Sequence, residues 1–156
     1  MQTVQSTAQY LGFRLADEEY GTDILQVQEI KCWDSVTRVP HAPPYMLGVM
    51  NLRGSIVPLI DLRLRLGSGP ARFEAATAVV VVQASGTRGR RTVGLVVDSV
   101  TQVYDVDPSQ LLPPPGVTGR PCAAFIKAIA DVDQRLLIIL DIQDLVAASV
   151  QGGSGE

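Results

Sequence analysis

Two valine-rich segments constrain the fold of this chain more than any other feature. Residues 77–82 and 92–97 are almost continuously apolar, and the polar stretch 85–91, with two glycines and three arginines, lies between them. β-Branched runs of this length around turn-forming residues predict the two strands of a hairpin. Because their apolar character does not alternate, both faces of each strand must be covered, as in a small closed barrel or at an interface.

Residues 49–67 predict a second hairpin that leads into a helical turn. Apolar runs flank residues 51–54, and Gly54 can adopt a positive φ there at no steric cost. Pro58 cannot donate a ladder hydrogen bond, so its strand is expected at a sheet edge or beside a bulge. Asp61 is the expected N-cap of one helical turn over residues 62–66, and Gly67 is its expected C-cap.

The rest of the chain repeats this pattern of short strands separated by turns. Strands are predicted at 10–15, 20–24, 36–39, 123–132 and 135–141. Helical turns are predicted at 45–47 and after Asp141, which caps a terminal helix. The spacing of Ile24, Val27 and Ile30 fits one face of a short helix better than a strand. So many short strands indicate a mainly β fold, either a barrel or a sandwich.

Breaks in the pattern suggest how the chain is organised. Ser68, Gly69 and Pro70 make the best candidate for a boundary between two subdomains, and the prolines of 112–116 predict a loop. The polar ends, residues 1–8 and 151–156, are expected to be flexible tails.

Composition narrows the classes of function. The chain has 156 residues and a net charge of −3, which argues against a nucleic-acid protein with a basic face. One histidine, His41, and two cysteines 90 positions apart, Cys32 and Cys122, are too few and too scattered for a metal site. The sequence has no nucleophile elbow and no phosphate-binding glycine loop. We therefore expect no catalytic residues, no metal and no cofactor.

Hydropathy predicts a soluble, cytoplasmic protein. No apolar run approaches the roughly 20 residues that a membrane-spanning helix requires, so no direct membrane insertion is expected. The polar N-terminus lacks the apolar region of a secretory signal.

Three stretches resemble segments of the CheW-like domain family of chemotaxis coupling proteins, and they follow one another in the same order as in that family. They are EEYGTDILQVQEI at 18–30, GVMNLRGSIVPLIDLRLRLG at 48–67 and TVGLVVDSVTQV at 92–103. The resemblance covers residues 10–145 and implies two small five-stranded SH3-like barrels side by side, with short helices that include a C-terminal one. On this reading, 10–148 is one domain, with subdomains at about 10–70 and 75–135 and a terminal strand and helix at 135–148.

The resemblance also implies a function and its residues. It implies a non-enzymatic adaptor that joins the cytoplasmic helical hairpin of a chemoreceptor to the regulatory domain of a CheA-type histidine kinase. Glu29 and Arg53 are expected to meet beside a groove between the barrels. The expected groove residues are Leu11, Ile24, Val27, Glu29, Ile30, Arg53, Val100 and Val103. The expected kinase-binding face is Val79, Val81, Val93 and Leu95.

Two alternatives stay open at this point. The same residues could serve a CheW-like scaffold of a non-flagellar chemosensory pathway, such as pilus motility or development. A small β-barrel enzyme or ligand-binding domain is the alternative from another class, and it predicts a deep polar pocket with converging titratable groups. The adaptor is expected to be cytoplasmic and recruited to membrane-associated receptor arrays, with ring assembly with the kinase left open.

Overall fold

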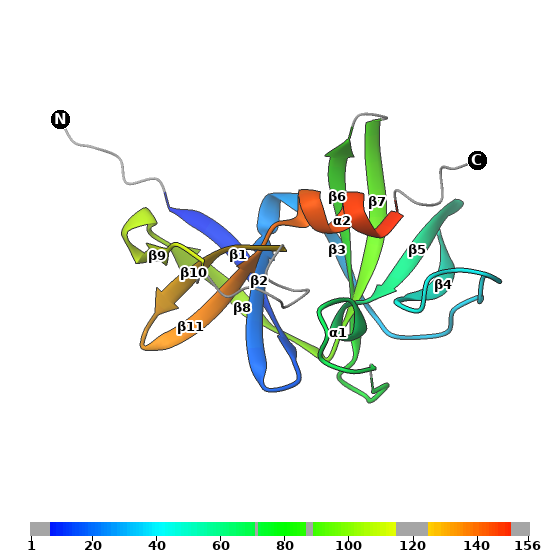
Figure 1. The fold of residues 1–156 in the computed structure, drawn as a ribbon, viewed down its shortest axis with the longest axis horizontal. Helices are drawn as coiled ribbons and strands as arrows, with labels where there is room; N and C mark the ends of the chain where they lie inside the picture. The colour runs from blue at the N-terminus through cyan, green and yellow to red at the C-terminus, as the bar shows by residue number, and fades with distance from the viewer. Residues whose placement is uncertain (1–6, 71, 87–88, 115–124, 151–156) are drawn as a thin grey trace.

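Two β-sheets hold all the strands of the computed structural model, which describes residues 7–70, 72–86, 89–114 and 125–150 (Figure 1). Sheet A has the strand order β8-β1-β2-β11-β10-β9, and sheet B has the order β3-β6-β7-β5-β4. The strands of sheet A are β1 (Ala8–Leu15), β2 (Glu18–Asp23), β8 (Ser99–Val106), β9 (Leu111–Leu112), β10 (Ile126–Val132) and β11 (Arg135–Leu140). The strands of sheet B are β3 (Val27–Cys32), β4 (Met46–Leu52), β5 (Ser55–Asp61), β6 (Ala78–Gly86) and β7 (Gly89–Val97). Short helices join them: η1 (Ile24–Gln26), α1 (Leu62–Arg65), η2 (Pro108–Gln110) and α2 (Ile142–Val150).

The mainly β fold with two sheets is confirmed, but the sheets do not divide the chain near residue 70. Sheet B takes five consecutive strands, β3 to β7, while sheet A joins β1 and β2 to the last four strands. A parallel pairing of β2 with β11, through Tyr20 and Ile138, connects the two ends of the chain. The predicted split at 10–70 and 75–135 is therefore wrong at the level of the sheets. Local patterns identify strands without identifying their partners.

Two of the three apolar clusters show that each sheet curls. The sheet A core contains Tyr10, Tyr104, Val106, Ala130, Val132, Leu137 and Ile139. The sheet B core contains Leu52, Val57, Leu59, Val79, Val81 and Val96. Both cores unite strands that are not neighbours in their sheet, which requires the curled shape of a small barrel. Sheet A has six strands where five were predicted, because the two-residue strand β9 pairs with β10.

The third cluster, the shared core, lies between the sheets. It includes Phe13 and Leu15 of β1, Val80 and Val82 of β6, and Leu145 of α2. The valine-rich hairpin therefore contributes one face to the sheet B core and the other to the shared core. This arrangement confirms the expectation that both faces of the hairpin are covered.

Turn and cap residues act as the sequence predicts. Arg53 and Gly54 adopt φ values of 50° and 88° between β4 and β5. Asp61 and Asp141 cap α1 and α2 through hydrogen bonds from the N–H groups of Leu64 and Asp144. The strand that contains Pro58 is internal and not at an edge, but its ladder with β4 has a register shift between Met46 and Gly48, next to the pair of Val49 with Pro58. The pairing of β5 with β7 begins only at Leu59.

Three local predictions differ from the structure. Residues 27–32 form strand β3, paired with β6, so Ile24, Val27 and Ile30 do not share a helical face. Sheet pairing overrides a three-residue spacing that is too short to specify a helix. The stretch 36–39 makes only one isolated bridge, Thr37 with Val49, and residues 45–47 lead into β4 without a helical turn.

Some predictions lie outside the described residues. These are the tails at 1–6 and 151–156, the tip of the valine hairpin at 87–88, and residues 115–124, which include Cys122 and part of the predicted loop at 112–116.

We predict that Leu95 of β7 is a stability residue. Its side chain is fully buried in the shared core, whereas Leu136 of β11 is 59% exposed. Leu95→Ala should lower the free energy of unfolding by about 2–5 kcal/mol, because it leaves a cavity in the core. Leu136→Ala, the matched control, should change it by less than about 0.5 kcal/mol. Urea denaturation followed by circular dichroism measures both. Equal losses of unfolding free energy in the two variants would contradict the assignment of Leu95 to the core and Leu136 to the surface.

Candidate docking surfaces

Glu29 and Arg53 form the ion pair that the sequence singled out. The Nη1 atom of Arg53 lies 2.6 Å from Oε2 of Glu29, and the two side chains are 70% and 22% exposed. The turn that carries Arg53 is held by a hydrogen bond from the Gly54 N–H to Oδ1 of Asn51. Glu29 belongs to β3, one edge of sheet B, and Arg53 follows β4, the other edge. The pair therefore spans the opening of this barrel.

A second contact narrows the same opening. Thr37 and Val49 exchange two backbone hydrogen bonds, of 3.0 and 2.8 Å. Gly48 makes this approach possible, since a Cβ atom at this position would collide with the carbonyl oxygen of Thr37. The segment that follows β3 is thus laid across the edge of β4.

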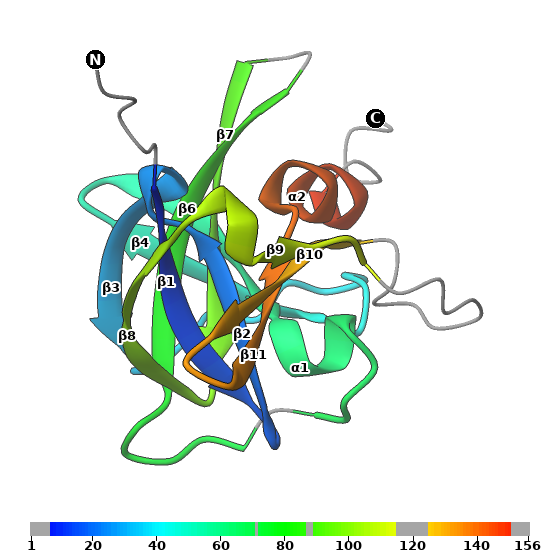
Figure 2. The same ribbon diagram turned by 90° about the vertical axis from the view of Figure 1, so that its left-hand side faces the viewer.

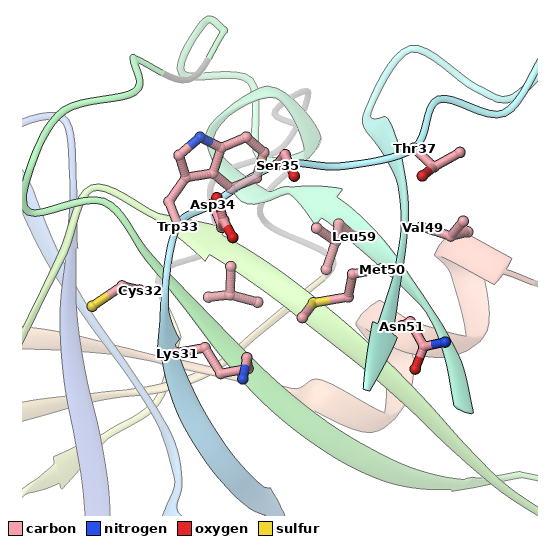
Figure 3. A pocket seen from close by; sticks show the side chains of 11 residues that line it. Lys31, Cys32, Trp33, Asp34, Ser35, Thr37, Val49, Met50, Asn51 and Leu59 are labelled. Atoms are coloured by element: carbon pink, nitrogen blue, oxygen red, sulfur yellow. The ribbon is translucent and has the colours of Figure 1, made fainter. Parts of the chain in front are cut away.

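A cavity of about 360 Å³ remains between these edges. Its lining includes Lys31, Trp33 and Asn51, and its floor is formed by Leu59 and Val79 of the sheet B core. Figure 3 shows Met50 and Leu59 between the end of β3 and the strand that carries Asn51, while Cys32 points away from them. The lining also includes Asp34, Ser35 and Thr37, so polar side chains border the apolar floor of this cavity.

Strands β3 and β8 lie on the side of the molecule opposite α1 and α2 (Figure 2), and both carry exposed apolar residues. Ile30 of β3 and Val103 of β8 are each 46% exposed. Ile24, Val27 and Val100 are half-buried against the shared core. We call these five residues the β3–β8 face. It combines residues from both sheets.

Leu25 is an exposed residue that the sequence did not select. It lies in η1 and is 89% exposed, while its neighbour Ile24 packs against the shared core. Asp23 caps this helical turn through a hydrogen bond from the Leu25 N–H. Two consecutive apolar residues carry no periodic signal, so the pattern could not tell which one faces solvent.

Five of the predicted contact residues are buried. Leu11 is 2% exposed and belongs to the shared core, so the groove prediction is wrong for this residue. Val79, Val81, Val93 and Leu95 are at most 2% exposed, so they cannot form a kinase-binding face. The cause is the position of β6 and β7, which lie inside sheet B with an apolar cluster on each side.

Titratable groups of the described residues gather at one polar cavity of about 350 Å³, whose lining includes Asp17, Arg63, Arg72, Glu74 and Asp98. Burial and, to a smaller degree, the charge of Asp23 raise the pKa of Tyr10 above its ordinary value. Among all the residues that the structure describes, no group of histidine, cysteine and carboxylate side chains could hold a metal ion. No described helix is both long and apolar enough to cross a membrane.

The fold and its surfaces are typical of a protein-binding domain. Two curled sheets surround a shared core, and apolar residues are exposed on edge strands. A family model described as CheW-like domain matches residues 9–150. The chemotaxis protein CheW of Klebsiella aerogenes is 38% identical over 140 residues, which cover 90% of this chain and 82% of that protein. The chain belongs to the CheW-like domain family.

Two further comparisons agree with this assignment. The crystal structure of the scaffolding protein TtCheW from Thermoanaerobacter tengcongensis superimposes with a TM-score of 0.81 at 35% identity, covering 90% of this chain and 92% of that one. Protein FrzA of Myxococcus xanthus is 30% identical over 145 residues, with 92% of this chain and 88% of FrzA covered. Family membership confirms the prediction of a chemotaxis scaffold that is not an enzyme.

We predict that the Arg53–Glu29 pair contributes little to folding. Arg53 is mostly exposed, and exposed ion pairs contribute about 0–1 kcal/mol. Arg53→Ala should therefore lower the free energy of unfolding by no more than about 1 kcal/mol, measured by urea denaturation. Glu29→Gln serves as the matched change on the other partner. A loss above about 2 kcal/mol in either variant would show that the pair holds the barrel closed.

Proposed function

We propose that this protein is an adaptor that couples chemoreceptors to a CheA-type histidine kinase in bacterial chemotaxis. One observation carries the proposal, which is that the β3–β8 face takes exposed apolar residues from both sheets and has an ion pair at its border. An amphipathic receptor helix would place its apolar stripe on such a face, with charged residues around the rim. The chemotaxis proteins named CheW among its relatives support the pathway.

The receptor contact centres on Ile30 and Val103 in this proposal. These two residues offer the largest exposed fractions of the β3–β8 face. Leu25 of η1 extends the surface, and Ile24, Val27 and Val100 form its half-buried floor. Glu29 lies within β3 and Arg53 in the turn between β4 and β5, where they can position polar groups of the receptor hairpin.

The kinase contact is proposed on the open side of sheet B, because the buried valines cannot supply it. Ile56, 64% exposed, pairs in register with Asn51, which lines the cavity between β3 and β4. Phe73, 49% exposed, stacks on Trp33 at 4.5 Å between ring centroids, and Trp33 lines the same cavity. The regulatory domain of the kinase would present apolar side chains to this surface.

Two separate contact surfaces on one small protein have a consequence for assembly. An adaptor of this kind can alternate with the kinase in a ring, where linked sites supply avidity and each contact needs only modest affinity. We propose that the protein is cytoplasmic and is recruited to membrane-associated arrays through the receptor.

A CheW-like scaffold of a non-flagellar chemosensory pathway is the second candidate. The similarity to Protein FrzA shows that the family is not confined to proteins named for chemotaxis. The same two surfaces would then contact a different receptor and kinase. Receptor fragments from each chemosensory system of the host, compared in parallel, distinguish the two pathways.

We predict separate effects of the two surfaces on binding. A charge in an apolar contact is costly, so Ile30→Asp should weaken binding of a receptor cytoplasmic fragment at least about tenfold, which is about 1.4 kcal/mol. The same variant should leave binding of the kinase regulatory domain unchanged, and Ile56→Asp should show the reverse. Isothermal titration calorimetry measures both affinities.

The matched control is Leu136→Asp, which adds the same charge at an exposed leucine of sheet A outside both surfaces. It should leave both affinities unchanged. If the wild-type protein binds neither cognate partner, the adaptor function is overturned. If Ile30→Asp behaves like Leu136→Asp, the β3–β8 face is not the receptor contact.

A further inference from the structure

One carboxylate joins the two sheets at the point where the chain passes from β7 to β8. Oδ2 of Asp98 accepts a hydrogen bond from the Ala16 N–H at 2.9 Å, in the β1–β2 turn of sheet A. The same oxygen lies 3.0 Å from Nη1 of Arg63, in α1, which follows β5 of sheet B. The Asp98 N–H also donates to the carbonyl oxygen of Arg14, at 3.0 Å. A single side chain thus has a partner in each half of the molecule.

The ion pair is shielded, in contrast to the pair at Arg53. The side chain of Arg63 is 14% exposed and that of Asp98 is 25% exposed. Nε of Arg63 is buried without a hydrogen-bond partner, so Asp98 provides the charge compensation for this guanidinium within the described residues. Removing one member of a shielded pair leaves the other uncompensated and perturbs its surroundings more than loss of an exposed pair would.

A second polar contact joins the sheets on the opposite side of the shared core. Gln143 of α2 accepts a hydrogen bond from the Ser85 N–H at 2.8 Å and donates to the Ser85 carbonyl oxygen at 2.6 Å. The helix follows β11 of sheet A, and Ser85 is near the end of β6 in sheet B. Figure 1 shows α2 in the upper part of the view, beside β6 and β7, and the β1–β2 turn and α1 in the lower part.

The physical roles of the core and the polar contacts differ. Apolar burial is non-directional, so the shared core holds the sheets together without specifying one angle between them. Charge-assisted hydrogen bonds depend on direction and distance, so they select one orientation. The Asp98 contact includes an ion pair, which the contact of Gln143 with Ser85 lacks.

We propose that Asp98 and Arg63 form a latch that fixes the orientation of sheet A relative to sheet B. The latch determines the spacing between Ile30 on β3 and Val103 on β8, and with it the shape of the β3–β8 face. Asp98 and Arg63 are positioning residues, which need not touch the partner. The effect of the latch on receptor binding rests on the proposed function, whereas its effect on the orientation of the sheets does not.

The direct test is a distance measurement between the two sheets. Spin labels at Gln102→Cys in β8 and Ser55→Cys in β5, both exposed positions, report this distance by double electron–electron resonance after Cys32 and Cys122 are replaced by serine. Asp98→Asn should broaden or shift the distance distribution. Arg63→Lys keeps the charge but loses the planar fork, so it should give a smaller change in the same direction.

The matched control is Asp105→Asn, which removes a charge from a carboxylate bonded to Gln9 within sheet A. It should leave the distribution as in the wild type. An unchanged distribution in folded Asp98→Asn overturns the latch. If Asp98→Asn does not fold, the distance distribution of Arg63→Lys is the test. A distribution of Arg63→Lys identical to that of the wild type would then overturn the latch.

Binding provides the second readout. Asp98→Asn should weaken binding of the receptor fragment about 2- to 30-fold, because the proposed receptor contact combines both sheets. The same variant should not change kinase binding, because the proposed kinase contact lies on sheet B alone. A changed distance distribution together with a wild-type protein that binds no receptor would sustain the latch and overturn the adaptor function. A changed distribution with unchanged receptor affinity in Asp98→Asn would overturn the link between the latch and the β3–β8 face.

Discussion

The burial of the β6–β7 hairpin on both faces is the constraint on which the rest of the structure depends. Val79, Val81 and Val96 fill the interior of sheet B, while Val80, Val82 and Leu95 face sheet A and α2. Neither set could be exposed to water without losing a large apolar area. The two sheets therefore form one folding unit in which the central hairpin belongs to two cores at once.

This constraint determines where a partner can bind. With β6 and β7 buried, the exposed apolar residues include Ile30 and Val103 on edge strands, Leu25 in η1 and Ile56 beside the β4–β5 turn. An exposed edge is a hazard for aggregation unless it is covered, short or charged. In this protein the Glu29–Arg53 pair and the Thr37–Val49 bridge close most of the opening of sheet B, and the cavity above Leu59 is what remains.

Features determined by local chemistry could be predicted from the sequence. The turn at Arg53 and Gly54, the caps at Asp61 and Asp141, and the valine hairpin depend on residues close together in the chain, and all are present. The pairing of Glu29 with Arg53 came from the family resemblance, since nothing in the local pattern of either residue indicates the other.

Features determined by long-range packing could not be predicted. The pairing of β2 with β11 joins segments more than 100 residues apart, and no local pattern encodes it. Leu11 and Val103 lie directly opposite each other in the β1–β8 ladder, yet Leu11 is 2% exposed and Val103 is 46% exposed. Strand β8 is an edge of sheet A, and β1 lies inside it between β8 and β2. Apolar residues on a strand reveal a face, but the position of that strand in the sheet decides whether the face is covered.

An adaptor without chemistry can influence a partner only through geometry, so its internal stiffness matters as much as its surfaces. Two barrels joined by a flexible linker would hold a receptor and a kinase near each other but would average out any change in orientation. Here the chain crosses between the sheets at η1 and at Asp98, the shared core fills the space between them, and polar contacts lie on both sides of it. A displacement at the β3–β8 face can then reach the open side of sheet B as a movement of the whole body. The shared core keeps the sheets together and the polar contacts fix their orientation, and both are needed for coupling by position.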